Sequence, residues 1–197
     1  DALPQGALGW SGFVAAVCNT AVAEGASDHL VGDPTEVALL TFARDAGIDP
    51  ELRTRIRLVD ELPFDSEHQR MTSLFELAPG RFVTAMKGAP EVILDRANFL
   101  CREGIEVPLD ASRRHEIEQA ASDMAADGLR VIALAYRTLE GHAQGELLEE
   151  GMVFVSIVGL ADPLRPEARA AIDACRRAGI RPMMLTAASV VVGASVI

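Results

Sequence analysis

Two apolar runs constrain the fold of this chain most strongly, at Leu129–Tyr136 and Met152–Leu160. Both are short, continuous and rich in Val, Ile and Leu, which is typical of strands buried on both faces. A loop containing glycine and glutamate separates them. We therefore expect the two runs to form central strands of a β-sheet.

A β-hairpin is predicted upstream of them. Thr72–Leu77 and Arg81–Met86 are rich in β-forming residues, and Ala78-Pro79-Gly80 between them is typical of a three-residue turn. This arrangement predicts that Lys87 lies at the end of a strand.

The stretch Lys87-Gly88-Ala89-Pro90-Glu91 is expected to lead from that strand into a helix. Pro90 suits the first turn because a helix needs no amide donor there. Gly88 allows backbone to approach a ligand closely, and a helix start favours an anion. The corner is a candidate phosphate site, although a lysine at a strand exit is more often simply solvated.

The remaining elements follow from periodicity and capping signals. A connecting segment is expected at Asp1–Trp10, followed by a helix at Phe13–Ala23. The other predictions are a helix capped by Asp33 with Pro34 in its first turn and Gly47 at its end, a strand at Ile56–Leu62 broken by Pro63, a hairpin at Cys101–Val107, and a helix at Ser112–Asp127 stopped by Gly128.

The character of the chain changes at Ala161-Asp162-Pro163-Leu164-Arg165-Pro166, where two prolines indicate a hinge. A helix at Glu167–Arg177 and a strand at Pro182–Leu185 then begin a βαβ pattern. We predict two units, residues 1–161 and residues 162–197. The first is an α+β domain with a mainly antiparallel sheet flanked by helices, and the second is a short α/β fragment.

Composition excludes some classes of function. With 18 basic and 29 acidic residues the net charge is −11, which argues against a nucleic-acid partner. Three widely spaced cysteines indicate neither a disulfide framework nor a zinc site, and favour a reducing compartment. The apolar run at residues 190–197 is far shorter than the ~20 residues needed to span a bilayer, so the chain is expected to be soluble.

Six short stretches between residues 17 and 186 carry a resemblance. They are Cys18-Asn19, Gly32-Asp33-Pro34-Thr35-Glu36, Leu62-Pro63-Phe64-Asp65-Ser66, Lys87-Gly88-Ala89-Pro90-Glu91, Gly128-Leu129-Arg130-Val131-Ile132-Ala133 and Asp162-Pro163-Leu164-Arg165. In order and spacing they resemble the nucleotide-binding domain of P-type cation-transporting ATPases, particularly the calcium and sodium pumps.

The resemblance implies a pocket for ATP. Phe64 would stack on adenine, Lys87 with Gly88 would lie beside the nucleotide, and Arg130 would bond phosphate oxygens. Three further residues are implied with smaller roles: Glu36 at the adenine amino group, and Met71 and Ile132 on the apolar side of the pocket.

Each of these residues also has a structural alternative. Phe64 could be a core residue beside a proline, and Arg130 could form an ion pair at a strand edge. Glu36 lies three residues after Asp33 and could complete a capping box. Met71 and Ile132 could belong to the core.

The sequence departs from the family pattern at several points. Where these pumps usually have a pocket lysine, this chain has Gln69, so either Arg70 substitutes for it or phosphate contact is weaker. The phosphorylated Asp-Lys-Thr-Gly-Thr stretch of the family does not occur. Ala187-Ala188 replace the usual glycine and aspartate, and the residues from 189 to 197 match no pattern of the family.

As implied by the resemblance, the chain is an ATP-binding domain that presents ATP to an aspartate in a neighbouring phosphorylation domain. It would bind ATP without hydrolysing it alone, with Mg²⁺ accompanying ATP in the full pump. Its other partners would be the phosphorylation and actuator domains of the parent pump. The domain would lie on the cytoplasmic side of the cell membrane, and only the helices of the parent pump would attach it to the membrane.

The sequence is also compatible with two other functions. A fragment of a haloacid-dehalogenase-like phosphatase would share the strand ending at Leu185-Thr186, but no Asp-x-Asp stretch supplies its nucleophile. An acidic interaction module without enzymatic activity would use Lys87 and Arg130 in surface ion pairs.

Overall fold

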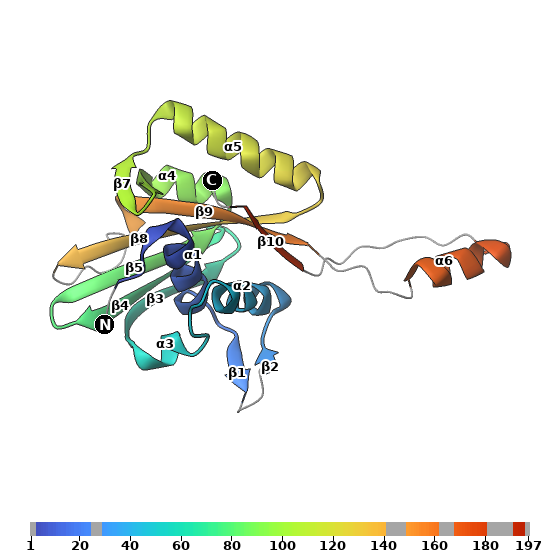
Figure 1. The fold of residues 1–197 in the computed structure, drawn as a ribbon, viewed down its shortest axis with the longest axis horizontal. Helices are drawn as coiled ribbons and strands as arrows, with labels where there is room; N and C mark the ends of the chain where they lie inside the picture. Colours follow the sequence, from blue (N-terminus) through green and yellow to red (C-terminus); the bar gives the residue numbers. More distant parts are fainter. Residues whose placement is uncertain (1–2, 25–28, 141–148, 162–167, 181–190, 196–197) are drawn as a thin grey trace.

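The computed structural model describes residues 3–24, 29–140, 149–161, 168–180 and 191–195. Its helices are α1 (Gly6–Val17), α2 (Pro34–Asp45), α3 (Leu52–Arg55), α4 (Pro90–Arg96), α5 (Ala111–Ala126) and α6 (Ala168–Arg177). Its strands are β1 (Val22–Glu24), β2 (His29–Val31), β3 (Arg57–Asp65), β4 (Arg70–Ala78), β5 (Arg81–Gly88), β6 (Ala97–Arg102), β7 (Ile105–Pro108), β8 (Arg130–Glu140), β9 (Met152–Ala161) and β10 (Val191–Ser195) (Figure 1).

An eight-stranded sheet carries the described part of the fold, in the order β3-β4-β5-β8-β9-β6-β7 with β10 paired to β9. Every pairing in this sheet is antiparallel except that of β6 with β9. The apolar runs that predicted central strands form β8 and β9, which pair from Arg130↔Leu160 to Tyr136↔Val153. The predicted α+β class with a mainly antiparallel sheet is confirmed.

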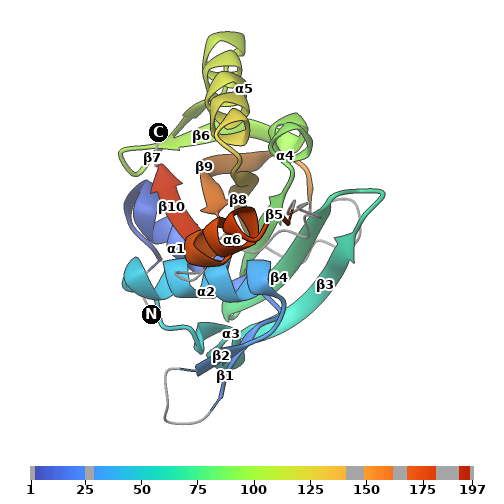
Figure 2. The same cartoon turned by 90° about the vertical axis from the view of Figure 1, so that its right-hand side faces the viewer.

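Helices cover both faces of the sheet (Figures 1 and 2). On one face lie α1 and α2, and Trp10 of α1 stacks on Tyr136 of β8 with ring centroids 3.6 Å apart. On the other face lie α4 and α5, whose residues Ile93 and Ile117 share an apolar cluster with Met86 of β5. Because side chains alternate along a strand, each central strand contributes to both layers.

Several local predictions are confirmed. The hairpin of β4 and β5, the hairpin of β6 and β7, and the helix α5 all lie where the sequence indicates. The Asp33 side chain accepts a hydrogen bond from the Thr35 amide at 2.9 Å, which caps α2 as expected. Cys18, Cys101 and Cys175 are all free thiols.

The first helix begins earlier than predicted. Residues 6–17 form α1, whereas the sequence indicated a connecting segment to Trp10 and a helix from Phe13 to Ala23. Glycines obscured its start, and Gly12 shows why one is there: an added Cβ would lie 2.8 Å from Ile48 Cγ1 and 2.9 Å from Ala46 Cβ. The glycine therefore allows α1 to pack closely against the segment that follows α2.

Pro63 does not end its strand as predicted. β3 continues to Asp65, with a register shift against β4 between Leu62 and Asp65. Because β3 is the edge strand of the sheet, a residue without an amide donor is tolerated there. As a result, Phe64 lies within β3 and not in a loop after it.

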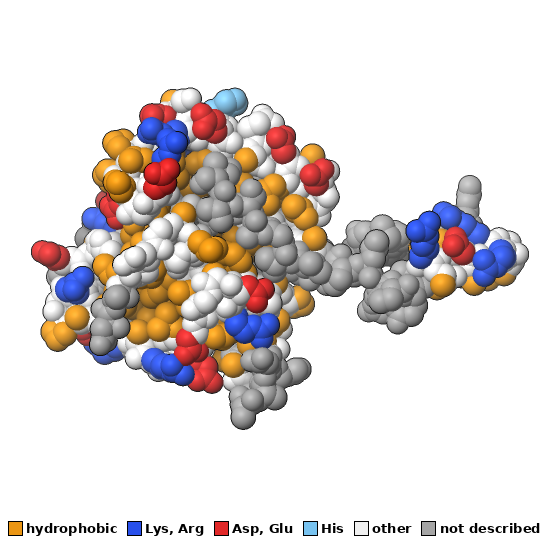
Figure 3. Space-filling model, in the orientation of Figure 1, with side chains coloured by type: hydrophobic (Ala, Val, Ile, Leu, Met, Phe, Trp, Pro, Cys, Tyr) orange, Lys and Arg blue, Asp and Glu red, His pale blue; other side chains and the backbone are white. Residues whose placement is uncertain are grey.

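The described C-terminal residues do not test the predicted division into residues 1–161 and residues 162–197. α6 begins at Ala168, close to the predicted Glu167, and it stands apart from the sheet in Figure 1. Of the hinge predicted at Ala161–Pro166, only Ala161 is described, as the last residue of β9, and the predicted strand Pro182–Leu185 lies outside the described residues. Figure 3 shows one face of the molecule, on which several Lys and Arg side chains lie on α6 and the others are scattered over the main body.

Candidate functional site

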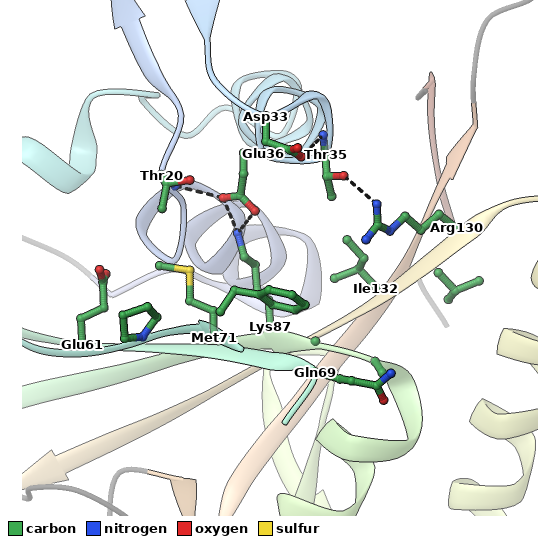
Figure 4. Close-up of a pocket in the computed structure, with 15 residues that line it drawn as sticks. Thr20, Asp33, Thr35, Glu36, Glu61, Gln69, Met71, Lys87, Arg130 and Ile132 are labelled. Carbon is green, nitrogen blue, oxygen red and sulfur yellow. Dashed lines mark hydrogen bonds and ion pairs between the residues drawn. The ribbon is translucent and has the colours of Figure 1, made fainter. Parts of the chain in front are cut away.

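A pocket of about 420 Å³ opens between α2 and the ends of four strands (Figure 4). Its size is that of typical small-molecule sites. The lining residues come from the segment after α1, the start of α2, the ends of β3 and β5, the β3–β4 turn, and the starts of β4 and β8. They are Thr20, Asp33, Thr35, Glu36, Glu61, Pro63, Phe64, Gln69, Met71, Lys87, Gly88, Ala89, Arg130, Val131 and Ile132. Of the eight predicted site residues, seven line this pocket.

Lys87 rises from the sheet at the deep end of the pocket. It pairs across the hairpin with Met71, so both side chains lie on the same face. Its ammonium lies 2.5 Å from each carboxylate oxygen of Glu36, and the residue is only 4% exposed. The predicted strand-end lysine is therefore not a solvated residue, and its charge is offset by a carboxylate.

Glu36 reaches down from the first turn of α2 toward Lys87 (Figure 4). Its Oε2 also accepts a hydrogen bond from the Thr20 amide at 2.9 Å. The Glu36 carboxylate is therefore held by Lys87 and Thr20, and the capping-box alternative with Asp33 is wrong. Asn19 supports this position, because its amide donates to the backbone carbonyls of Ala15 and Glu36.

Arg130 lies at the more open end of the pocket. It is the first residue of β8, and its side chain donates to Thr35 Oγ1 at 3.2 Å (Figure 4). No carboxylate of the described residues lies within 4.0 Å of its guanidinium. The strand-edge ion pair considered from sequence is thus not found in the described part of the chain.

Phe64 forms part of the wall near the end of β3. Its side chain is 59% exposed, so it is not a core residue. An exposed phenyl ring on the wall of a pocket offers a flat apolar surface to a ligand. Met71 lies beneath the pocket, is 1% exposed and also belongs to the main apolar core, so both sequence interpretations hold for it.

Gly88 lines the pocket, but the space it leaves is taken by the protein itself. A Cβ added there would lie 2.5 Å from the Gln69 carbonyl oxygen and 2.8 Å from Arg70 Cβ. The glycine therefore lets the β3–β4 turn approach β5. In that turn Gln69 has φ +51°, an uncommon conformation for a residue with a side chain, and its carbonyl accepts from the Ala89 amide at 3.0 Å.

Arg70 is the predicted site residue that does not line the pocket. Strand alternation turns it to the opposite face, where Nε and one terminal nitrogen bond the two Glu149 carboxylate oxygens at 2.8 and 2.6 Å. Gln69 occupies the pocket position beside it. Arg70 is therefore engaged elsewhere and does not replace the missing lysine.

The pKa of Glu149 is set by the residues around it on the opposite face of the sheet, Arg70, Thr72 and Arg96. Burial acts to raise the pKa of its carboxyl, but hydrogen bonds from Arg70 and Thr72, with the charges of Arg70 and Arg96, lower it overall. The residue is consequently an ionised carboxylate at neutral pH.

Several lining residues were not predicted. Thr20, Asp33, Thr35, Glu61, Pro63, Gln69, Ala89 and Val131 line the pocket beside the predicted set. Five of them belong to the motifs that carry the resemblance, which is the signal that could have indicated them: Asp33, Thr35, Pro63, Ala89 and Val131. Gln69 lies at the position where the family usually has a pocket lysine. Thr20 and Glu61 lie outside these motifs, each directly beside one, and the fold brings them to the pocket.

Comparison with known proteins identifies the family of the chain. Residues 12–167 match the family described as "P-type ATPase, cytoplasmic domain N". The chain belongs to this family of P-type ATPase domains.

Relatives of known name support the same assignment. The calcium-transporting ATPase of Bacillus subtilis is 36% identical over 87% of this chain and 20% of its own length. Cation-transporting ATPase pma1 of Synechocystis is 40% identical over 86% of this chain and 19% of its own length. Calcium-transporting ATPase 1 of Yarrowia lipolytica is 34% identical over 91% and 20%. The chain thus spans about a fifth of the length of these relatives.

No helix among the described residues has the length and apolar character needed to cross a membrane. The described residues likewise contain no group of three His, Cys, Asp or Glu side chains placed to hold a metal ion.

Proposed function

We propose that this pocket binds ATP, with adenine stacked on Phe64 at the Lys87–Glu36 end and the phosphates directed to Arg130. The observation that carries the proposal is the exposed Phe64 ring on the wall of a pocket that also contains Lys87 and Arg130. The charge of Lys87 is offset by Glu36, whereas no carboxylate of the described residues offsets that of Arg130. The family of the chain supports it, because P-type ATPases use ATP.

The charge balance sets the direction of the nucleotide. Glu36 offsets the charge of Lys87, whereas Arg130 donates only to a neutral hydroxyl among its described contacts. A polyphosphate is therefore attracted more strongly to Arg130 than to Lys87. The ammonium and carboxylate of the inner pair offer both a donor and an acceptor, which suits the mixed edge of a purine.

The expected affinity is modest. One base stack contributes ~1–3 kcal/mol and each charge-assisted hydrogen bond ~1.5–3 kcal/mol, against an association cost of ~4–15 kcal/mol. The balance corresponds to a dissociation constant nearer millimolar than nanomolar.

In the parent protein the domain would present the terminal phosphate to a phosphorylatable aspartate of a neighbouring domain. Arg130 is exposed, so phosphates held there would stay accessible from outside the pocket. Since no Asp-Lys-Thr-Gly-Thr stretch occurs in the sequence, the chain alone is expected to bind ATP without turnover. Cation transport would be the function of the whole pump, as the names of the relatives suggest.

Magnesium would arrive with ATP. The described residues do not fit a magnesium site of their own, because no group of three possible ligands lies together. No step of the proposed function therefore passes through a protein-bound metal.

Calorimetric titration with ATP, inorganic triphosphate and adenosine tests the proposal. ATP is expected to bind at about millimolar concentration, and each partial ligand more weakly, because ATP alone engages both ends of the pocket. Triphosphate binding as tightly as ATP would instead indicate an anion site without base recognition. Release of phosphate from ATP or a generic phosphate ester above background would support the phosphatase alternative.

A further inference from the structure

A second buried ion pair lies directly behind the pocket, on the face of the sheet covered by α4 and α5. Glu149 accepts two hydrogen bonds from Arg70 and one from Thr72 Oγ1 at 2.8 Å, with an Arg96 nitrogen 3.8 Å away. Its side chain is 3% exposed. Such a pair gives a fixed geometry, because two parallel bonds restrict both side chains.

Arg70 is surrounded in the sheet by residues of the pocket. Its two chain neighbours, Gln69 and Met71, line the pocket, and so does Gly88, its cross-strand partner in β5. Its partner in β3 is Asp65, which follows the lining residue Phe64. The Gln69 carbonyl bonds the Ala89 amide at 3.0 Å across the same gap. Any shift of Arg70 along the strand therefore moves residues on the pocket side.

The turn that Arg70 ends is held in an uncommon backbone conformation. Gln69 has φ +51°, and its amide bonds the Asp65 carbonyl at 2.6 Å. A residue with a side chain keeps this conformation only where its surroundings impose it. Anchoring of Arg70 by Glu149 is one such constraint, and it comes from a residue 79 positions away in sequence.

We infer that Glu149 is a positioning residue for the nucleotide pocket: through Arg70 it holds the Asp65–Gln69 turn against Gly88 and Ala89. The inference rests on the proposed function and assigns Arg70 an indirect role in it. Glu149 and Arg70 touch no ligand in this arrangement. They determine where Gln69 and Phe64 stand relative to Lys87.

The test uses Glu149→Gln, which preserves shape and removes the charge. The dissociation constant for ATP is expected to rise about 3- to 10-fold, because a neutral acceptor binds the guanidinium less tightly. Without nucleotide, hydrogen exchange of the Ala89 amide should accelerate, because its acceptor Gln69 is released. Exchange at this one amide is a readout that general destabilisation would not single out.

Two further variants serve as control and second test. Glu106→Gln makes the same chemical change at a carboxylate that accepts from Tyr136 and lies outside the pocket lining, so it should change neither ATP affinity nor Ala89 exchange. Arg70→Lys keeps the charge but cannot form two parallel bonds, and it should act in the same direction as Glu149→Gln. If Glu149→Gln does not fold, Arg70→Lys decides the question.

The possible outcomes separate the two claims. Unchanged ATP affinity and unchanged Ala89 exchange in Glu149→Gln and Arg70→Lys, with saturable binding by the wild type, would overturn the positioning role alone. Absence of ATP binding by the wild type would overturn the proposed function, and the positioning role with it.

Discussion

Two buried ion pairs stand at neighbouring strand ends on opposite faces of one sheet. Lys87 of β5 pairs with Glu36 on the α1–α2 face, and Arg70 of β4 pairs with Glu149 on the α4–α5 face. Their chemistry is similar, and both join residues far apart in sequence. Only the first lines the pocket, so strand alternation rather than residue type decides which cation can meet a ligand.

The surroundings of the two pairs also differ. Both Glu149 carboxylate oxygens are bonded by Arg70, with Thr72 donating as well, although Glu149 also lines a second pocket of about 650 Å³ together with Arg96. Glu36 and Lys87 line the first pocket. The two parallel bonds of the Arg70–Glu149 pair contribute fixed geometry, whereas the Lys87–Glu36 pair offers polar atoms to a ligand in the first pocket. Variants that affect one face and spare the other test this distinction.

The largest effect is expected from Lys87→Met. Removing one partner of a buried pair leaves Glu36 uncompensated and should lower the free energy of unfolding by about 3 kcal/mol, with loss of ATP binding. Urea unfolding and calorimetric titration measure the two effects. The double variant Lys87→Met with Glu36→Gln should recover most of the stability and none of the binding. Recovery of both would show that the pair does not contact the nucleotide.

Phe64→Ala should weaken ATP binding by about 5- to 150-fold, corresponding to loss of one base stack of ~1–3 kcal/mol. Its thermal stability should change little, because the ring is exposed. Phe99→Ala removes another partly exposed phenyl ring, on β6 and outside the pocket lining, and should leave affinity unchanged. Equal loss of affinity in both variants would contradict stacking on Phe64.

Acid should affect the Arg70–Glu149 pair in a predictable direction. The pKa of Glu149 is lowered in the folded state, so its stabilising contribution is present above its unfolded pKa and is lost as the pH falls through the folded value. The difference in unfolding free energy between wild type and Glu149→Gln should be constant near pH 7 and shrink at acid pH. A difference that grew on acidification would have the wrong sign.

The smallest effect is expected from Gln69→Lys. A lysine on the pocket wall adds a cation that no carboxylate is expected to offset, and an exposed charge of this kind is worth ~0.2–1 kcal/mol, or about 1.5- to 5-fold tighter ATP binding. The gain should diminish in high salt. Gln119→Lys, on α5 and outside the pocket lining, supplies the same charge as a control. An equal gain in that variant would indicate a long-range effect of net charge.

Much of the fold could be predicted because its signals are local. The apolar runs of β8 and β9, the turn at Ala78-Pro79-Gly80 and the Asp33 cap each determine an element from adjacent residues. The errors at α1 and Pro63 arise where tertiary context overrides local preference. Close packing at Gly12 and the edge position of β3 are properties of the assembled sheet.

The site could be predicted only in part for the same reason. Seven of eight predicted residues line the pocket, and six of these seven, all except Met71, belong to the motifs that resemble a known family. Arg70 lies on the other face because β4 and β5 pair in a register that places Met71 opposite Lys87. The sequence alone does not determine this register. Thr20 and Glu149 were not predicted, because the Thr20 amide bonds a residue 16 positions away and Glu149 accepts hydrogen bonds from residues 77 and 79 positions away.

The most direct test is to follow backbone amide shifts of the wild-type domain during titration with ATP. Saturable changes at about millimolar nucleotide, centred on Phe64, Lys87–Ala89 and Arg130–Ile132, are the result expected for a base at the inner end and phosphates at Arg130. Changes that do not saturate, or that centre on residues away from this pocket, would contradict nucleotide binding at the site.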